Sequence, residues 1–189
     1  MAQTEAPTKQ ILMSDMLTGG NTVGTRRVKV ENGDTAYHEG RKFRAFYDFT
    51  GATMPVVLKF VINKPINLML STQEVHDGAL RYRVFTGGVE GGVFGTTIPS
   101  LRTNNKVGIP VIDSGVTLTT GGTLDVTGQA VNDVVYVRTA GASGQTSTVA
   151  DATLSDRGFP PTTAYVVIDK IPSASKSPEG VLKYEWSVD

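Results

Sequence analysis

The feature that most constrains this chain is a repeated alternation of apolar and polar residues, in short runs separated by turn residues. In the last run, VLKYEWSV, Leu182, Tyr184, Trp186 and Val188 share one face of an extended strand, and polar residues occupy the other. Successive side chains of a strand point to opposite faces, so this pattern is typical of a strand with one buried face. Trp186 is the only tryptophan of the chain, and we expect it in the core.

Three earlier runs, KFRAFYDF, MPVVLKFVI and ALRYRVF, alternate in the same way. Each predicts a strand whose apolar face lies against the core and whose other face is wet. The expected inward sets are Phe43, Ala45, Tyr47 and Phe49; then Val56, Leu58, Phe60 and Ile62; then Leu80, Tyr82 and Val84, with Arg81, Arg83 and Phe85 on the wet face.

Turn pairs separate the runs, and no stretch shows a convincing helical period of 3.6 residues. Asn32-Gly33 is expected to close a hairpin, and Asp77-Gly78 and Gly121-Gly122 mark further turns. About eight to ten strands at short spacing predict an all-β fold, an antiparallel β-sandwich or a jelly roll with an extended N-terminal arm.

The chain divides, on this reading, into an arm at 1–24 and a β-sandwich domain at 25–189. The arm is polar apart from one apolar cluster, closed by Gly19-Gly20; it is either a loose tail or a segment that docks onto a partner. Within the domain, residues 139–163 are rich in Gly, Ser and Thr and are expected to form a long surface loop. No internal repeat is present.

Composition narrows the classes of function. With 18 basic and 18 acidic residues the chain carries no net charge, so nucleic-acid binding is not expected. It has no cysteine, and no apolar run reaches the length of about 20 residues that crosses a bilayer. Residues 1–106 hold 13 basic and 9 acidic groups, against 5 and 9 in 107–189, which reflects either chance or complementary subunit contacts.

No motif indicates catalysis, a cofactor or a metal. The glycine-rich stretch RVFTGGVEGGVFGTTIPSLRTNN lacks both the dinucleotide-binding and the P-loop spacing, and is expected to be a structural crossover. His38 and His76 each lie beside an acid without a third partner, so we expect both on the surface. Any two strands could still bring Asp or Glu side chains to the distance that glycoside hydrolysis needs, so a β-sandwich hydrolase is one further hypothesis.

The order of three segments, YHEGRKFRAFYDF, VVLKFVINKPINLMLSTQ and GALRYRVFTGGVEGGVFGTTIPSLRTNN, resembles a family of small β-rich virion proteins of tailed bacteriophages. The resemblance covers roughly 37–126 and the terminal strand. The chain departs from the family pattern in its longer loop after Thr139 and in its apolar arm. The matching positions are His38 and Gly40, residues 90–95, and Arg102, Asn104 and Asn105.

Members of this family resemble head-decoration, cement or head-fibre proteins, which implies a non-enzymatic role on the outer surface of a phage capsid. The implied partners are the major capsid protein and other copies of this chain in a homotrimer, with no small-molecule substrate; the virion would assemble in the bacterial cytoplasm. A fibre or adhesin that binds host glycan, through Tyr136, Phe159 and the long loop, is the alternative. The candidate contact residues are Ile11, Leu12, Met13, Met16, Leu17, Arg26, Arg27, Arg41, Lys42, Arg102, Asn104 and Asn105.

Overall fold

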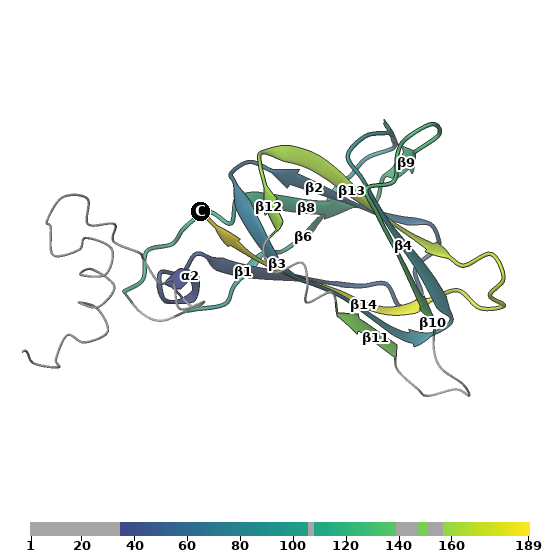
Figure 1. The fold of residues 1–189 in the computed structure, drawn as a ribbon, viewed down its shortest axis with the longest axis horizontal. Coiled ribbons are helices and arrows are strands. Elements are labelled where there is room, and N and C mark those ends of the chain that lie inside the picture. The colour runs from purple at the N-terminus through teal and green to yellow at the C-terminus, as the bar shows by residue number, and fades with distance from the viewer. Residues whose placement is uncertain (1–34, 106–107, 139–146, 151–156) are drawn as a thin grey trace, which may run out of the picture. The chain divides into compact units, whose positions relative to one another are not determined.

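The computed structural model describes residues 35–105, 108–138, 147–150 and 157–189. The chain divides into two units, Met1–Thr35 and Ala36–Asp189, and the strands that the structure describes belong to the second (Figure 1). The elements in chain order are α2 (Thr35–His38), β1 (Lys42–Asp48), β2 (Val56–Ile62), β3 (Ile66–Asp77), β4 (Ala79–Phe85), β5 (Val89–Gly91), β6 (Thr96–Ile98), β7 (Leu101–Arg102), β8 (Val116–Thr120), β9 (Thr123–Asp125), β10 (Asp133–Arg138), β11 (Ser147–Ala150), β12 (Arg157–Phe159), β13 (Thr162–Lys170) and β14 (Glu179–Val188).

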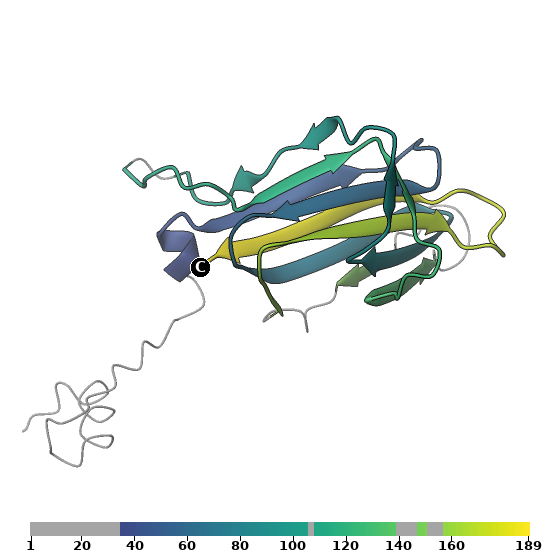
Figure 2. The same cartoon turned by 90° about the horizontal axis from the view of Figure 1, so that it is seen from above.

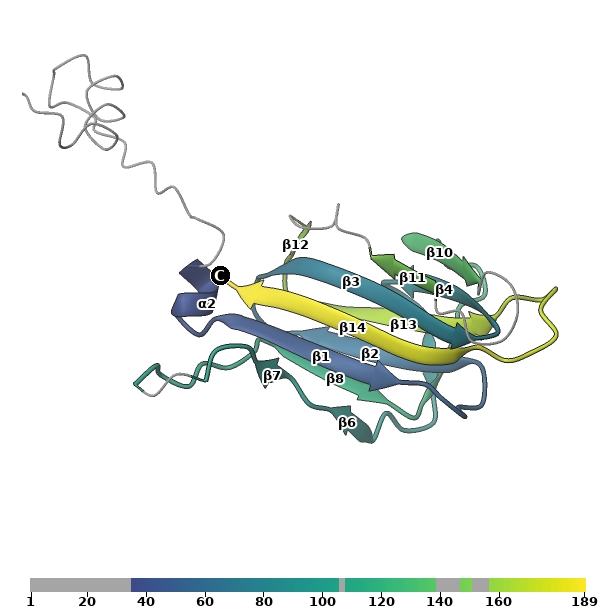
Figure 3. The same cartoon turned by 90° about the horizontal axis from the view of Figure 1, so that it is seen from below.

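Two antiparallel sheets form the domain. One sheet has the order β11-β3-β14-β1-β7, with β12 also paired to β3 (Figure 3), and the other has the order β10-β4-β13-β2-β8-β6. Eight main strands follow one another along the chain: β1, β2, β3, β4, β10, β11, β13 and β14. The first pairs with the eighth (β1·β14), the second with the seventh (β2·β13), the third with the sixth (β3·β11) and the fourth with the fifth (β4·β10). This nested pairing is that of a jelly roll, so the predicted fold class is confirmed.

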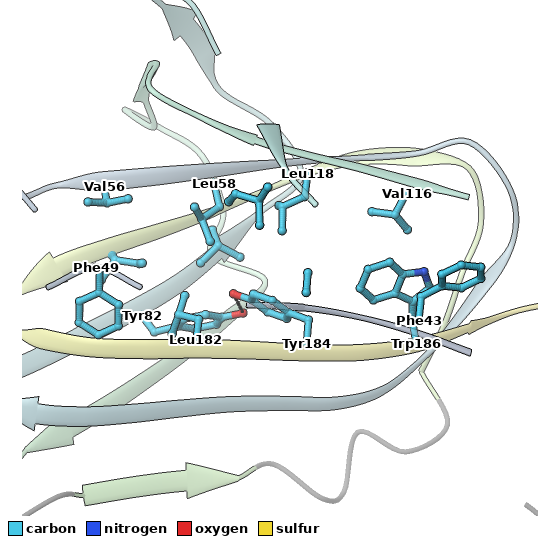
Figure 4. Close-up of a cluster of buried hydrophobic side chains, with 14 of the residues drawn as sticks. Phe43, Phe49, Val56, Leu58, Tyr82, Val116, Leu118, Leu182, Tyr184 and Trp186 are labelled. Atoms are coloured by element: carbon cyan, nitrogen blue, oxygen red, sulfur yellow. Dashed lines mark hydrogen bonds between the residues drawn. The ribbon is translucent and has the colours of Figure 1, made fainter. Parts of the chain in front are cut away.

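The core lies between the two sheets and contains the inward faces that alternation predicted (Figure 4). Trp186 is 1% exposed and stacks on Phe43, with 6.1 Å between the ring centroids. The indole Nε1–H donates to the backbone carbonyl of Ser114 at 2.8 Å, so the one polar atom of the indole is satisfied. The predicted inward faces of β1, β2 and β14 are therefore correct.

The region expected to form a hairpin around Asn32-Gly33 differs from the prediction. Asn32 and Gly33 lie outside the described residues, but residues 35–38, which would belong to the returning strand, form the helix α2. The helix ends in a Schellman motif: Gly40 has φ 72°, its N–H bonds to the carbonyl of Tyr37, and the N–H of Arg41 bonds to that of Ala36. Among the described residues no helix is long and apolar enough to cross a bilayer.

The expected long loop at 139–163 also needs correction. Two short strands, β11 and β12, lie in it and pair with β3, and β13 already begins at Thr162. Strands of three and four residues carry too few side chains to show an alternation in the sequence. Their position depends instead on backbone hydrogen bonds to the 12-residue strand β3, which the sequence pattern does not reveal.

The first part of the glycine-rich stretch folds back over the outer face of the second sheet, and its later part forms β6 and β7 at the edges of the two main sheets. Its strand β5 pairs with β9 to form a small separate ribbon, and Phe94 and Leu124 pack there against Phe85 and Tyr165. Phe85 is therefore 1% exposed, although alternation placed it on the wet face. The stretch is a covering hairpin as well as a crossover, and we call residues 87–95 together with 121–126 the covering segment.

Strand β3 carries a β-bulge that changes which of its residues face the core. Its register against β14 shifts between Glu185 and Trp186, which pair with Leu70 and Leu68. Ile66 is buried before the bulge at an even position, whereas Ser71 and Gln73 are buried after it at odd positions. The extra residue thus turns two polar side chains into the interior.

Candidate functional site

Five of the predicted contact residues gather at the end of the sandwich that carries α2. Their backbones meet because β7 pairs with β1, with Arg102 opposite Phe43, and because the N–H of Thr103 bonds to the carbonyl of Lys42 at 3.0 Å. The residues brought together are Arg41, Lys42, Arg102, Asn104 and Asn105.

Most of these side chains are engaged within the chain. Arg41 donates to Glu39 at 2.7 Å and to the carbonyl of Val188, and Lys42 lies 3.6 Å from Glu185. The contacts of Arg41 with Val188 and of Lys42 with Glu185 tie the turn after α2 and the start of β1 to the C-terminal strand. Because Glu39 and Glu185 already partly neutralise the charges of Arg41 and Lys42, these two side chains can contribute less to the binding of a partner than their residue types suggest.

Arg102 and Asn104 support the segment that follows β7. The guanidinium Nη1 of Arg102 donates to the carbonyl of Pro110 at 2.7 Å, and the buried Asn104 donates from Nδ2 to the carbonyl of Tyr37 at 2.8 Å. Gly40 lies directly beneath this segment, because a Cβ there would be 2.6 Å from Cγ2 of Ile109. Of the five residues, only Asn105 is exposed to solvent.

The segment 108–115, held by Arg102, extends past the strand ends at the α2 side (Figure 2). Val111 on it is 93% exposed, and Leu101 and Tyr37 nearby are 45% and 36% exposed. Because Val111 stands almost wholly in water on a backbone that Arg102 fixes nearby, we take it as a further candidate contact residue. Sequence reasoning missed Val111, because nothing in its neighbourhood marks it as exposed.

A second exposed apolar group lies on the covering segment, over the outer face of the other sheet (Figure 1). Val89 and Val93 are 70% and 79% exposed there. The covering segment is attached by Glu90, whose carboxylate accepts hydrogen bonds from Lys59 at 2.9 Å and from the hydroxyl of Tyr165. Those bonds lower the pKa of Glu90, while burial and the Glu90 contact raise the pKa of Tyr165 to about 12.

The residues of the glycan-binding alternative are separated. Tyr136 is 59% exposed and lies opposite Arg81 on the outer face of the sheet, where Arg81 and Arg83 share the carboxylate of Asp169. Phe159 instead packs against the core, so it does not join Tyr136 on one surface.

The remaining predicted contact residues lie outside the described residues: Ile11, Leu12, Met13, Met16, Leu17, Arg26 and Arg27. His38 and His76 are exposed, as expected, and His76 lies 3.7 Å from Glu74. Within the described ranges no group of three or more His, Asp and Glu side chains could hold a metal ion. The chain matches no protein-family model, and no curated protein or solved structure is significantly similar to it.

Proposed function

We propose that this protein is a non-enzymatic structural protein of a tailed-phage virion, which binds the outer surface of the capsid and cross-links major capsid subunits. The observation that supports the proposal is the presence of exposed apolar side chains in two separate places. Tyr37, Leu101 and Val111 lie at the α2 end, and Val89 and Val93 lie on the covering segment. A protein that bridges neighbours in a shell needs at least two such surfaces.

The jelly-roll fold suits this role. Capsid proteins and lectins both use the fold, in which two packed sheets form a rigid body whose connections are free to carry contacts. The α2 end and the covering segment are connections of this kind. Their backbones are fixed by Arg102 and by Glu90, so little entropy is lost when a partner binds.

The proposed mechanism is multivalent attachment. If the chain assembles as a homotrimer, a first contact with the shell makes the next two intramolecular, which raises the overall avidity by roughly 10²-fold or more. Binding that favours only the expanded lattice then stabilises the expanded head. A shell held in this way requires no catalytic residue.

The test uses particles purified from the phage that encodes the chain. We expect the chain to sediment with heads in hundreds of copies, as counted by quantitative mass spectrometry. Val111→Asp and Val93→Asp are each expected to reduce occupancy, and the double variant to abolish it, because both side chains are far too exposed to affect folding. Ser175→Asp, in the exposed β13–β14 connection, is the matched control and should bind normally.

Two results would contradict the proposal. Absence of the chain from particles, or a few copies confined to a tail or fibre, excludes head cross-linking. If only a few copies are found in a tail or fibre, binding of host glycan should be measured for wild type and for Tyr136→Ala. Loss of glycan binding in the variant would establish the adhesin alternative, which the exposure of Tyr136 opposite Arg81 favours.

A further inference from the structure

A cavity of about 120 Å³ lies between the two sheets, among residues of the described part of the chain. Two of its lining side chains, Ser71 and Ala164, are small, so the facing sheets leave space there. Trp186 and Tyr184 line it from β14. Gln73 also lines it, and Thr86, Asn132 and Asp133 lie at its rim.

Gln73 is the unexplained group of this cavity. Its side chain is 1% exposed and its Nε2 donates to the hydroxyl of Ser71 at 2.9 Å, but its Oε1 has no hydrogen-bond partner. A buried, unsatisfied amide oxygen destabilises the folded chain and calls for a cause. The β3 bulge is what turns Gln73 and Ser71 inward, and bulges that redirect side chains are frequent beside functional sites.

The rest of the lining limits what can bind. It is mostly apolar, and its one ionisable carboxyl, Asp133, lies at the partly exposed rim with the exposed Thr86 and Asn132. Burial raises the pKa of Tyr184, so its hydroxyl stays protonated. A charged ligand would lose its hydration without gaining a counter-ion deep in the cavity. In size, the cavity is close to an engineered cavity of roughly 150 Å³ that binds benzene.

We propose that this cavity binds a small neutral molecule, with an apolar body of about one six-membered ring and one hydroxyl group that donates to Gln73. The rim at Thr86, Asn132 and Asp133 is the entrance. The ligand is bound and not turned over. The inference is independent of the capsid role, since the cavity is inside the sandwich and the proposed capsid contacts are outside it.

The probes are phenol and toluene, which have the same ring and differ in a hydroxyl or a methyl group. Trp186 lines the cavity, so its fluorescence, excited where neither probe absorbs, reports binding to the full chain. We expect saturable binding of phenol at least as tight as that of toluene, although water solvates phenol better. Amide chemical shifts in NMR spectra should change at the lining residues and not on the surface.

The decisive variant is Gln73→Met, which keeps the side-chain length and removes the acceptor. The phenol-to-toluene affinity ratio should fall at least tenfold, and toluene should still bind. Gln129→Leu, at an exposed glutamine, is the matched control and should leave the ratio unchanged.

The proposal fails if neither probe binds wild type, if toluene binds and phenol does not, or if Gln73→Met leaves the ratio intact. The comparison of the two probes on wild type stands by itself should the variant fold poorly.

Discussion

Truncation of Trp186 to alanine tests whether the two sheets are held together as described. The indole is 1% exposed, stacks on Phe43 and donates a hydrogen bond to the carbonyl of Ser114 at 2.8 Å. It also forms part of the wall of the interior cavity. The substitution therefore removes ring contacts with the core and a hydrogen bond, and it enlarges a space that the surrounding side chains already fail to fill.

The expected cost follows from these losses. Replacing a buried Trp by Ala costs about 3–5 kcal/mol, and the upper half applies where neighbours cannot close the gap. The pre-existing cavity indicates that they cannot. Since 1 kcal/mol lowers the Tm of a domain of this size by about 2–4 °C, we expect a fall of roughly 8–20 °C.

Urea and thermal unfolding should be followed by far-UV circular dichroism, because the variant has lost the only tryptophan of the chain. Trp186→Phe keeps a ring and removes the N–H donor, so its cost should be smaller. Tyr136→Ala is the control for loss of an exposed aromatic side chain, and it should change stability by less than about 0.5 kcal/mol. An unchanged midpoint for Trp186→Ala would refute the packing described for β14.

Three other perturbations have defined outcomes. Gly180→Ala should destabilise the fold by about 1–3 kcal/mol or more in urea unfolding, because a Cβ there would lie 2.0 Å from the backbone oxygen of Glu74; a neutral effect would contradict the β3–β14 register. The hydrogen bond from Lys59 lowers the pKa of Glu90, so its contribution is complete above the ordinary glutamate pKa of about 4.3 and is lost as pH falls through the lower folded value. Hydrogen exchange in the covering segment should therefore accelerate in acid, and Glu90→Gln should remove that pH dependence. Deleting residues 2–24 should leave the Tm nearly unchanged and weaken attachment to heads tenfold or more; full attachment would exclude a docking arm.

The inward faces of β1, β2 and β14 could be predicted because a strand's side-chain period is 2, and each run is long enough to show it. Phe85 could not be placed in the same way. Its alternation assigned it correctly to the outer face, but that face is covered by Phe94 and Leu124 from a segment with little apolar content. Burial by a distant part of the chain leaves no trace in the local pattern.

The structure brings some of the candidate contact residues together at the α2 end, and their role in contacts stays a prediction. Arg102 and Asn104 do lie together with Arg41, but they bind backbone carbonyls, and their residue types cannot distinguish a surface contact from an internal support. Val111 was missed for the opposite reason. An isolated valine between a proline and an isoleucine reads as a buried residue, and only the path of the backbone places it in water.

The sequence of strand β3 does show that its alternation of inward and outward side chains must be interrupted. Ile66 and Leu68 occupy even positions and Val75 an odd one, so they can all face one core only if the strand holds one extra residue between them. The sequence does not say where the extra residue lies. Placing it after Leu70 would keep another leucine inside, whereas the register with β14 places it before Leu70 and brings Ser71 inside.

The observed position of the bulge replaces an apolar contact in the core by a buried, hydrogen-bonded pair, Gln73 and Ser71, in which one oxygen is unsatisfied. Such departures from the local sequence pattern are expected at functional sites. If the Gln73–Ser71 pair serves binding, removing both partners should cost little stability. We therefore expect the double variant Gln73→Met/Ser71→Ala to lie within about 1 kcal/mol of wild type, or above it, in urea unfolding. If the pair instead holds the sandwich together, the double variant will lose several times that amount, and the polar interior of β3 will need a purely structural explanation.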